Sequence, residues 1–422
     1  NVGNLVVFDV NSGVGAQCLM DQAVSVKAMI LDTLNTVTLV QGTNDVRIQS
    51  AGFQQKAGTF MGGSGQFEAI GPFELTGGAF TAPSQRLYLR ANFVHTGGVF
   101  SNNSGTVFFV GTTVMSDTIA NPFAHVVISN SLTAPSGLMR VQGNWTDNGS
   151  FQANNGTVEF SGTTVLSGVS TTRFSQITLT GTVTGNPNAI SVAGDWVNSG
   201  VFDPAGGTVR FSGDTEISGT STTSFDRVEI TGILSGHASI PIEVAGDWVN
   251  NGTFNPNNGT VVFSGYSQIT GTRTSSFAQV TITGTLLGHP SNPLRVAGDW
   301  TQNGIFSNRN GTVIFNGLSA VGGTHSSVFH RVEIWGQMTA PATNLYVTGD
   351  WINHGTFLPN GGTVLMDGTT LLSGSMVSEF NTLRVRGTVR LGAAELIGDA
   401  SAVEVYGVCN LDGKSETIGS LS

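Results

Sequence analysis

Carboxylates recur at one position of this sequence, directly before a tryptophan. The Gly-Asp-Trp line occurs four times, with the aspartates Asp195, Asp247, Asp299 and Asp350. Carboxylates at turns are oxygen ligands that calcium accepts. In a stack of coils, however, equivalent aspartates would lie three coils apart, roughly 14 Å at ~4.8 Å per coil, too far to share an ion. We therefore predict that they fix a turn through side-chain-to-backbone bonds, and that there is no metal site.

The tryptophans of these lines recur at a constant period of about 52 residues. They are Trp145, Trp196, Trp248, Trp300 and Trp351. A row of exposed aromatic rings could stack on the sugars of a polysaccharide. Phe93 occupies the same position one unit earlier, and the tryptophans lie among valines and phenylalanines in the sequence. We therefore interpret the tryptophans as interior or corner filling. Trp335 and Tyr346 depart from the repeat, so they are the aromatic residues we expect to be exposed.

Evidence for catalysis is weak. Cleaving a polysaccharide needs two carboxylates, or a carboxylate and a base, that converge. Glu229 and Glu243 occupy matching positions of neighbouring predicted coils and are the only such pair, and Arg210 one coil earlier favours a ladder of exposed charges. His237 and His289 share a loop position, but the chain lacks a His-x-x-x-His, phosphate-loop or nucleophile-elbow motif. We predict that the chain is not an enzyme and binds no cofactor.

Asparagine has both a chemical and a structural interpretation. Asn-Gly pairs precede threonine in four formal glycosylation sequons, at Asn155, Asn251, Asn258 and Asn310. Asn-Gly is also a preferred tight-turn pair, because both residues accept positive φ. We favour the turn.

The two cysteines, Cys18 and Cys409, lie near opposite ends of the sequence. About twenty coils at ~4.8 Å would separate them by on the order of 100 Å, which excludes an internal disulfide. We expect buried free thiols, with a bond to a neighbouring molecule as the alternative.

The element that must position these residues is a tandem repeat. Phenylalanines keep step with the tryptophans at Phe109, Phe160, Phe211, Phe263 and Phe315, and alternation within short segments, such as Val261 and Phe263, is typical of β-strands. Within one unit the strand-ending glycines are Gly265, Gly284, Gly298 and Gly317, so that two longer steps flank a shorter one. We interpret this as three coils per unit. Earlier in the chain, Phe53, Phe73 and Phe93 begin similar lines at a constant, shorter step.

These patterns predict an all-β fold, a single right-handed parallel β-helix. We expect an N-terminal cap or irregular coils at residues 1–52 and irregular C-terminal coils at 385–422. Between them we expect coils of about 20 residues at 53–92, then about six units of roughly 51–52 residues at 93–384. Right-handedness is expected because the six-residue period of left-handed β-helices is missing. A solenoid grows along one axis, so 422 residues need no division into globular domains.

The composition argues against several classes of binding partner. The net charge is −10 with 17 basic residues, which argues against nucleic acid or an anionic membrane surface. No apolar run reaches the ~20 residues that span a bilayer, so we predict a protein that is not membrane-spanning. The sequence begins at Asn1 without a visible signal peptide, as expected of a processed or partial chain.

The Gly-Asp-Trp-x-Asn-x-Gly-x-Phe lines, followed by Gly-Thr-Val-x-Phe-x-Gly, resemble tandem repeats of large bacterial surface and secreted proteins. Leu411–Leu421 is similar to the strand repeat of autotransporter passenger domains. Together the resemblances cover roughly residues 53–421. They imply an exported, extended β-helical scaffold for adhesion, surface coating or filament building.

Two functions follow as expectations. The first is a non-catalytic extracellular structural protein, a stiff subunit of a filament, sheath or layer that forms a homopolymer. The second is a carbohydrate-binding adhesin or a carbohydrate-active β-helix enzyme that contacts polysaccharide. Open strand edges at both ends, in Val2–Val10 and Leu411–Leu421, favour the first.

Overall fold

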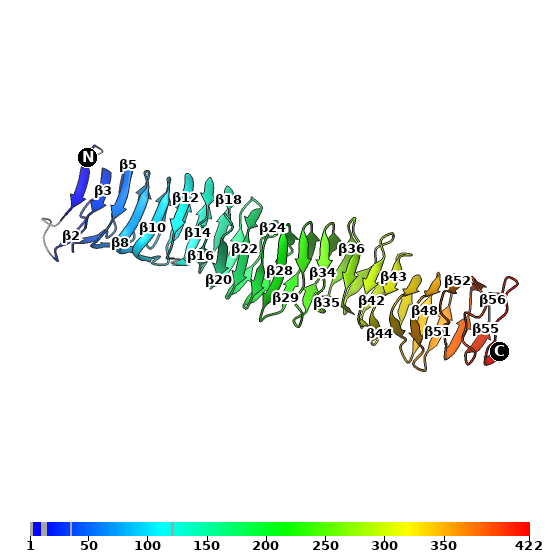
Figure 1. Cartoon of the computed structure of the whole chain (residues 1–422). Helices are drawn as coiled ribbons and strands as arrows, with labels where there is room; N and C mark the ends of the chain where they lie inside the picture. The colour runs from blue at the N-terminus through cyan, green and yellow to red at the C-terminus, as the bar shows by residue number, and fades with distance from the viewer. Residues whose placement is uncertain (1–2, 10–14, 34–35, 120–121) are drawn as a thin grey trace. The chain divides into compact units, whose positions relative to one another are not determined.

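The computed structural model describes residues 3–9, 15–33, 36–119 and 122–422. These residues form strands and turns and no helix, so they contain no helix that could cross a membrane. They divide into an N-terminal unit, residues 1–208 with 219–221, and a C-terminal unit, residues 209–218 with 222–422. Within each unit short strands stack in parallel (Figure 1). The predicted all-β, right-handed parallel β-helical fold is confirmed for this part of the chain.

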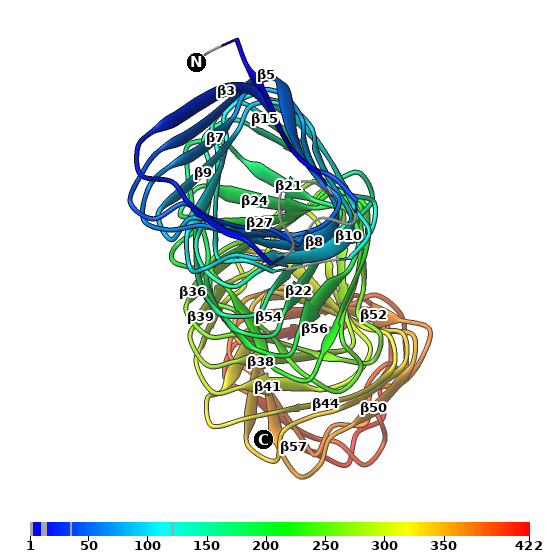
Figure 2. The same ribbon diagram turned by 90° about the vertical axis from the view of Figure 1, so that its left-hand side faces the viewer.

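In the N-terminal unit the strands that follow Phe53 pair at steps of 20 residues. Phe53 of β5 (Val46–Gln55) pairs with Phe73 of β8 (Phe73–Thr81), which pairs with Phe93 of β10 (Phe93–Ser101). These first coils have a three-sided outline when viewed from their end (Figure 2). The predicted N-terminal strand edge Val2–Val10 contains β1 (Leu5–Phe8), and Val2 and Val10 lie outside the described residues.

The long repeat makes two and two-thirds turns, so the predicted three coils per unit is wrong. In the C-terminal unit β35 (Thr260–Phe263) pairs with β38 (Gln279–Ile282), which pairs with β41 (Trp300–Gln302), so three strands make one turn. Successive tryptophans are eight strands apart, in β33 (Trp248–Asn250), β41 and β49 (Trp351–Asn353). The two longer glycine steps are full turns. The shorter step, from Gly284 to Gly298, covers only two strands, because glycine ends a strand rather than a coil.

Equivalent positions therefore change face from one repeat to the next. In the C-terminal unit Trp248, Trp300 and Trp351 lie in three different sheets. In the N-terminal unit Trp145 of β17 (Trp145–Asp147) and Trp196 of β25 (Trp196–Asn198) lie in two different sheets. Each new repeat also starts a new sheet. For example, β21 (Thr172–Phe174) opens a sheet beside β18 (Ser150–Gln152), which belongs to another.

Alternating strand residues fill the interior. Val261 and Phe263 are 1 % and 0 % exposed, so the predicted phase of this strand is confirmed. The ring of Phe263 packs edge-on against Phe277 at 5.8 Å, and Trp248 packs against Phe254 at 4.8 Å. Aromatic pairs of this geometry stabilise a core beyond the area they bury.

The predicted turns form at three of the four Asn-Gly positions, but the pair with positive φ is the asparagine and the residue before it, because Gly156, Gly259 and Gly311 do not have positive φ. Asn155, Asn258 and Asn310 have φ between 59° and 61°, and the residue before each is also in the left-handed region. Asn251 is different because its side chain accepts a hydrogen bond from the backbone N–H of Thr272 in the next coil.

The C-terminal coils contain less strand than predicted. Of Leu411–Leu421 only β57 (Ser420–Leu421) is a strand, paired with β55 (Ala402–Val405). The preceding strand is β56 (Val408–Asn410). The segment between them turns at Asp412 and Gly413, which both have positive φ, so the predicted continuous strand is not formed.

Candidate functional site

The repeated tryptophans lie inside the solenoid. All five are at most 1 % exposed, so they present no ring face to a sugar. Their indole N–H groups meet hydroxyls of the next coil in two repeats, where Trp248 Nε1 donates to Ser275 Oγ at 3.2 Å and Trp351 Nε1 donates to Ser378 Oγ at 2.9 Å. In these two repeats the tryptophan thus fills the interior and carries one satisfied polar bond.

A buried amide two residues after the tryptophan holds the corner together. Asn250 Oδ1 accepts a hydrogen bond from the Gly252 N–H at 3.3 Å, and its Nδ2 donates to the Thr274 carbonyl at 3.0 Å. Asn353 makes the equivalent bonds to Gly355 and Val377. One side chain therefore links its own turn to the next coil, which is how a buried polar group avoids a desolvation penalty.

Asp147 replaces the amide in the first of these repeats and is 1 % exposed. Its Oδ1 accepts a hydrogen bond from the Gly149 N–H at 3.2 Å, and its Oδ2 accepts one from Thr172 Oγ1 at 3.1 Å. Burial raises the pKa of the Asp147 carboxyl, and these two hydrogen bonds act in the opposite direction. A carboxylate has no donor to offer, so it cannot bond a carbonyl of the next coil as Asn250 does.

The Gly-Asp-Trp aspartates lie at or near the surface, and two of them, Asp299 and Asp350, bond backbone one coil further on rather than within their own turn as predicted. Asp299 Oδ1 accepts a hydrogen bond from the Ala320 N–H at 3.0 Å, and Asp350 Oδ1 accepts one from the Leu371 N–H at 3.1 Å. Asp247 is near Arg227, with Oδ2 and Nη1 3.7 Å apart. Asp195 is half-buried. No cluster of metal-binding side chains forms among the residues that the structure describes.

The expected pair of carboxylates does not form. Glu229 lies in β30 (Arg227–Ile230) and Glu243 in β32 (Ile242–Val244), two strands apart and in different sheets. Glu229 binds Arg210 at 2.9 Å, whereas Glu243 accepts a hydrogen bond from Ser224 Oγ at 2.8 Å. The predicted pairing fails because the step between the two glutamates is two-thirds of a turn. The predicted contact of Glu229 with Arg210 is confirmed.

The remaining candidates have local roles. His237 Nδ1 accepts hydrogen bonds from the backbone of Ser239 and Ile240, and His289 repeats this arrangement in its own loop. Trp335 is 56 % exposed, as predicted, and lies against His354 with ring centroids 4.4 Å apart. Tyr346 is only half-exposed.

Both cysteines are free thiols in end coils. Cys18 of β2 (Gln17–Leu19) is exposed, contrary to the prediction of burial, because no described coil covers that strand. Cys409 of β56 is half-buried, and burial raises the pKa of its thiol, with a smaller contribution from Glu416.

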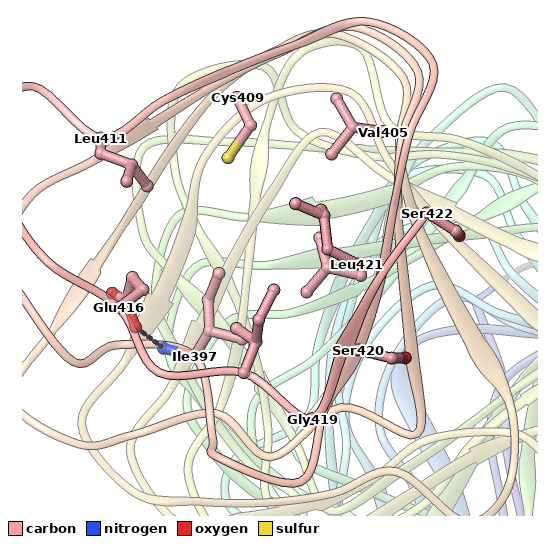
Figure 3. A pocket seen from close by; sticks show the side chains of 11 residues that line it. Ile397, Val405, Cys409, Leu411, Glu416, Gly419, Ser420, Leu421 and Ser422 are labelled. Atoms are coloured by element: carbon pink, nitrogen blue, oxygen red, sulfur yellow. Dashed lines mark hydrogen bonds between the residues drawn. The ribbon is translucent and has the colours of Figure 1, made fainter.

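Cys409 also lines an apolar cavity of about 850 Å³ over the last coil. Ile397, Val405, Leu411 and Leu421 surround it, and the Glu416 carboxylate at its rim accepts a hydrogen bond from the Ile397 N–H at 3.1 Å (Figure 3).

A second hollow, not predicted from the sequence, lies on the outer face of the N-terminal unit. It measures about 410 Å³ and is lined by Asp45, Arg47, Gln66, Glu68, Tyr88 and Arg90. These residues come from β5, β7 (Phe67–Ala69), β9 (Arg86–Leu89) and the adjoining turns. In the sequence, the hollow corresponds to residues spaced by about one coil each, namely Arg47, Glu68, Tyr88 and Phe108. The chemical type differs at nearly every step, so the series is not visible as a repeat.

Comparison with known proteins gives no family to which these sites can be referred. No protein-family model matches the sequence, and no curated protein or solved structure is significantly similar to it.

Proposed function

We propose that this chain is a non-catalytic structural protein of an extracellular surface, a stiff β-solenoid subunit of a filament, sheath or layer. The observation that carries this proposal is the apolar surface of the two end coils. In the N-terminal unit Leu5 and Leu19 are 56 % and 65 % exposed, and in the C-terminal unit Val408 and Leu421 are 55 % and 69 % exposed. Exposed apolar patches of this kind are typical of interaction sites.

The occupant of the C-terminal cavity is the first coil of a second copy. β1 pairs with β3 (Val24–Leu31), β57 pairs with β55, and the other edge of each pairs with no strand among the described residues. A joint between two different surfaces of identical subunits forms a closed ring only if its rotation closes. Otherwise it propagates as a fibre. The repeated polar residues support a structural role, because Asn250, Asp299 and His237 are all engaged in bonds within the fold.

Sedimentation tests the joint. We expect the purified chain to form fibres, and expect either Leu19→Glu or Leu421→Glu to yield short species, because a buried unpaired carboxylate destabilises an interface. Leu318→Glu, at a side-wall residue that is 76 % exposed, is the matched control and should leave fibre length unchanged. Monodisperse wild-type monomer, or equal fibres from all three variants, would refute this function.

The second candidate, a carbohydrate-binding adhesin, is favoured by the exposed Trp335, which packs against His354. The enzymatic form of this candidate loses its only expected carboxylate pair, since Glu229 and Glu243 lie in different sheets. Quenching of Trp335 fluorescence by polysaccharide would support the adhesin.

A further inference from the structure

The hollow beside Tyr88 combines an aromatic wall with a charged floor. Tyr88 pairs in register with Glu68 on one side and with Phe108 on the other. The rings of Tyr88 and Phe108 are stacked, with centroids 4.9 Å apart and planes 28° apart. Phe108 therefore covers one side of the tyrosine ring, and the other side borders the hollow. Stacking of this kind holds the ring in place before a ligand arrives.

The floor is a carboxylate held between two arginines. Arg47 Nε lies 3.1 Å from Glu68 Oε2, and Arg90 Nε lies 2.5 Å from Glu68 Oε1. The side chain of Glu68 is 18 % exposed, whereas those of Arg47 and Arg90 are 55 % and 46 % exposed. Each guanidinium has five N–H donors and uses its Nε here, so further donors remain for a ligand.

The charges that line the hollow cancel, because Arg47 and Arg90 are matched by Asp45 and Glu68. An uncharged ligand therefore fits better than an ion. The lining offers both donors and acceptors, and vicinal hydroxyl groups are the ligand groups that both donate and accept hydrogen bonds. The apolar face of a pyranose ring is the natural partner of a flat aromatic wall.

We propose that this hollow binds a neutral pyranose residue of a polysaccharide. The sugar ring lies against Tyr88, and its hydroxyls bond the guanidinium of Arg90 and the carboxylate edge of Glu68. A volume of about 410 Å³ is within the usual range of small-ligand sites. The site lies in the side wall of the N-terminal unit and does not depend on the proposed assembly, so a chain that never polymerises would still bind.

Saturation-transfer NMR of the intact chain with cellotriose, maltotriose, mannotriose and, as the acidic arm, trigalacturonate tests the proposal. We expect at least one neutral trisaccharide to bind more tightly than trigalacturonate. Tyr88→Leu keeps the apolar bulk but removes the flat ring, and Arg90→Met keeps the length but removes the donors. Each should weaken binding by tenfold or more.

Matched controls are Tyr266→Leu and Arg273→Met in the C-terminal unit, both at exposed positions. They should leave binding unchanged, and thermal melts of all four variants should match the parent. Two independent variants keep the test decisive if one fails to fold. Failure of every neutral sugar at millimolar concentration, tighter binding of trigalacturonate, or unaltered binding by either folded site variant would overturn the site. Sedimentation measures assembly and NMR measures sugar binding, so the assembly proposal and the sugar-site proposal can fail independently.

Discussion

Replacing Asp147 by asparagine should stabilise the N-terminal unit at neutral pH. The new Nδ2 would face the Thr171 carbonyl, since Asn250 Nδ2 donates to the equivalent Thr274 carbonyl at 3.0 Å. One added hydrogen bond contributes ~1 kcal/mol, because the Thr172 hydroxyl, which donates to Asp147 Oδ2, can instead accept from the new Nδ2, as Ser275 Oγ accepts from Asn250 Nδ2. Removing an ionised carboxylate that is 1 % exposed adds ~1–2 kcal/mol, so the total is ~2–3 kcal/mol.

This gain should depend on pH. Because burial raises the pKa of Asp147, the folded chain binds this proton more tightly than the unfolded chain. The stability that Asp147 contributes is therefore fully present below its unfolded pKa, about 4, and is lost as the pH rises through the folded pKa. Asp147→Asn removes this dependence, so its advantage should be large at about pH 7 and small below about pH 4.

Native-state hydrogen exchange is the assay, since it reads the free energy of local opening in a repeat protein that need not unfold as one unit. We expect protection of the amides in β17 and β21 to rise about 30- to 150-fold at neutral pH, which is ~2–3 kcal/mol. The mirror variant Asn250→Asp should lower protection in β33 by a similar factor. Unchanged protection in Asp147→Asn at neutral pH, or a fully protected Asn250→Asp, would refute the role given to the amide.

Three further substitutions test other parts of the fold. Phe263→Ala should destabilise by ~3–5 kcal/mol, because it empties a fully buried position; an unchanged urea midpoint would contradict the packing. Gly271→Ala should cost at least ~2 kcal/mol, because φ is +110° and the new Cβ would clash with the Asn250 carbonyl oxygen, whereas Gly137→Ala has no atom within 4 Å and should melt like the parent. Asp299→Ala should cost ~0.5–1.5 kcal/mol through its lost bond to the next coil. Calcium should not change its melting temperature or that of the parent, and a calcium-dependent rise in the parent alone would restore the metal hypothesis.

Within the repeats the sequence is sufficient to predict strands, their phase and the interior, whereas in Leu411–Leu421 only Ser420–Leu421 forms the expected strand. Alternation places Phe263 inward because side chains on a strand have a period of two, and large apolar side chains are stabilised by burial. The number of turns per repeat is not predictable in the same way. The spacing of the tryptophans fits three coils or two and two-thirds, and only the pairing of strands such as β35 with β38 decides between them.

The candidate sites, like the number of turns per repeat, depend on strand pairing that the sequence does not show. Glu229 and Glu243 form a pair only if every glycine step is a full coil. Alternation of apolar and polar residues predicts that asparagine faces solvent, whereas Asn250 and Asn353 are buried. Their burial could therefore not be predicted from the pattern. The hollow at Tyr88 depends on neighbours one coil apart whose chemical types differ, which becomes visible only after the register is known.

The fractional turn of the repeat constrains how such a chain can lengthen. Duplicating one repeat adds two whole turns and two-thirds of another, so every residue after the insertion is re-aimed by one face of the solenoid. A ligand patch downstream would then point in a new direction although its own sequence had not changed. Only a gain or loss of three repeats, eight full turns or ~38 Å of axis at ~4.8 Å per turn, returns the later surface to its original heading. A variant that keeps the direction of a downstream binding face should therefore gain or lose repeats in threes.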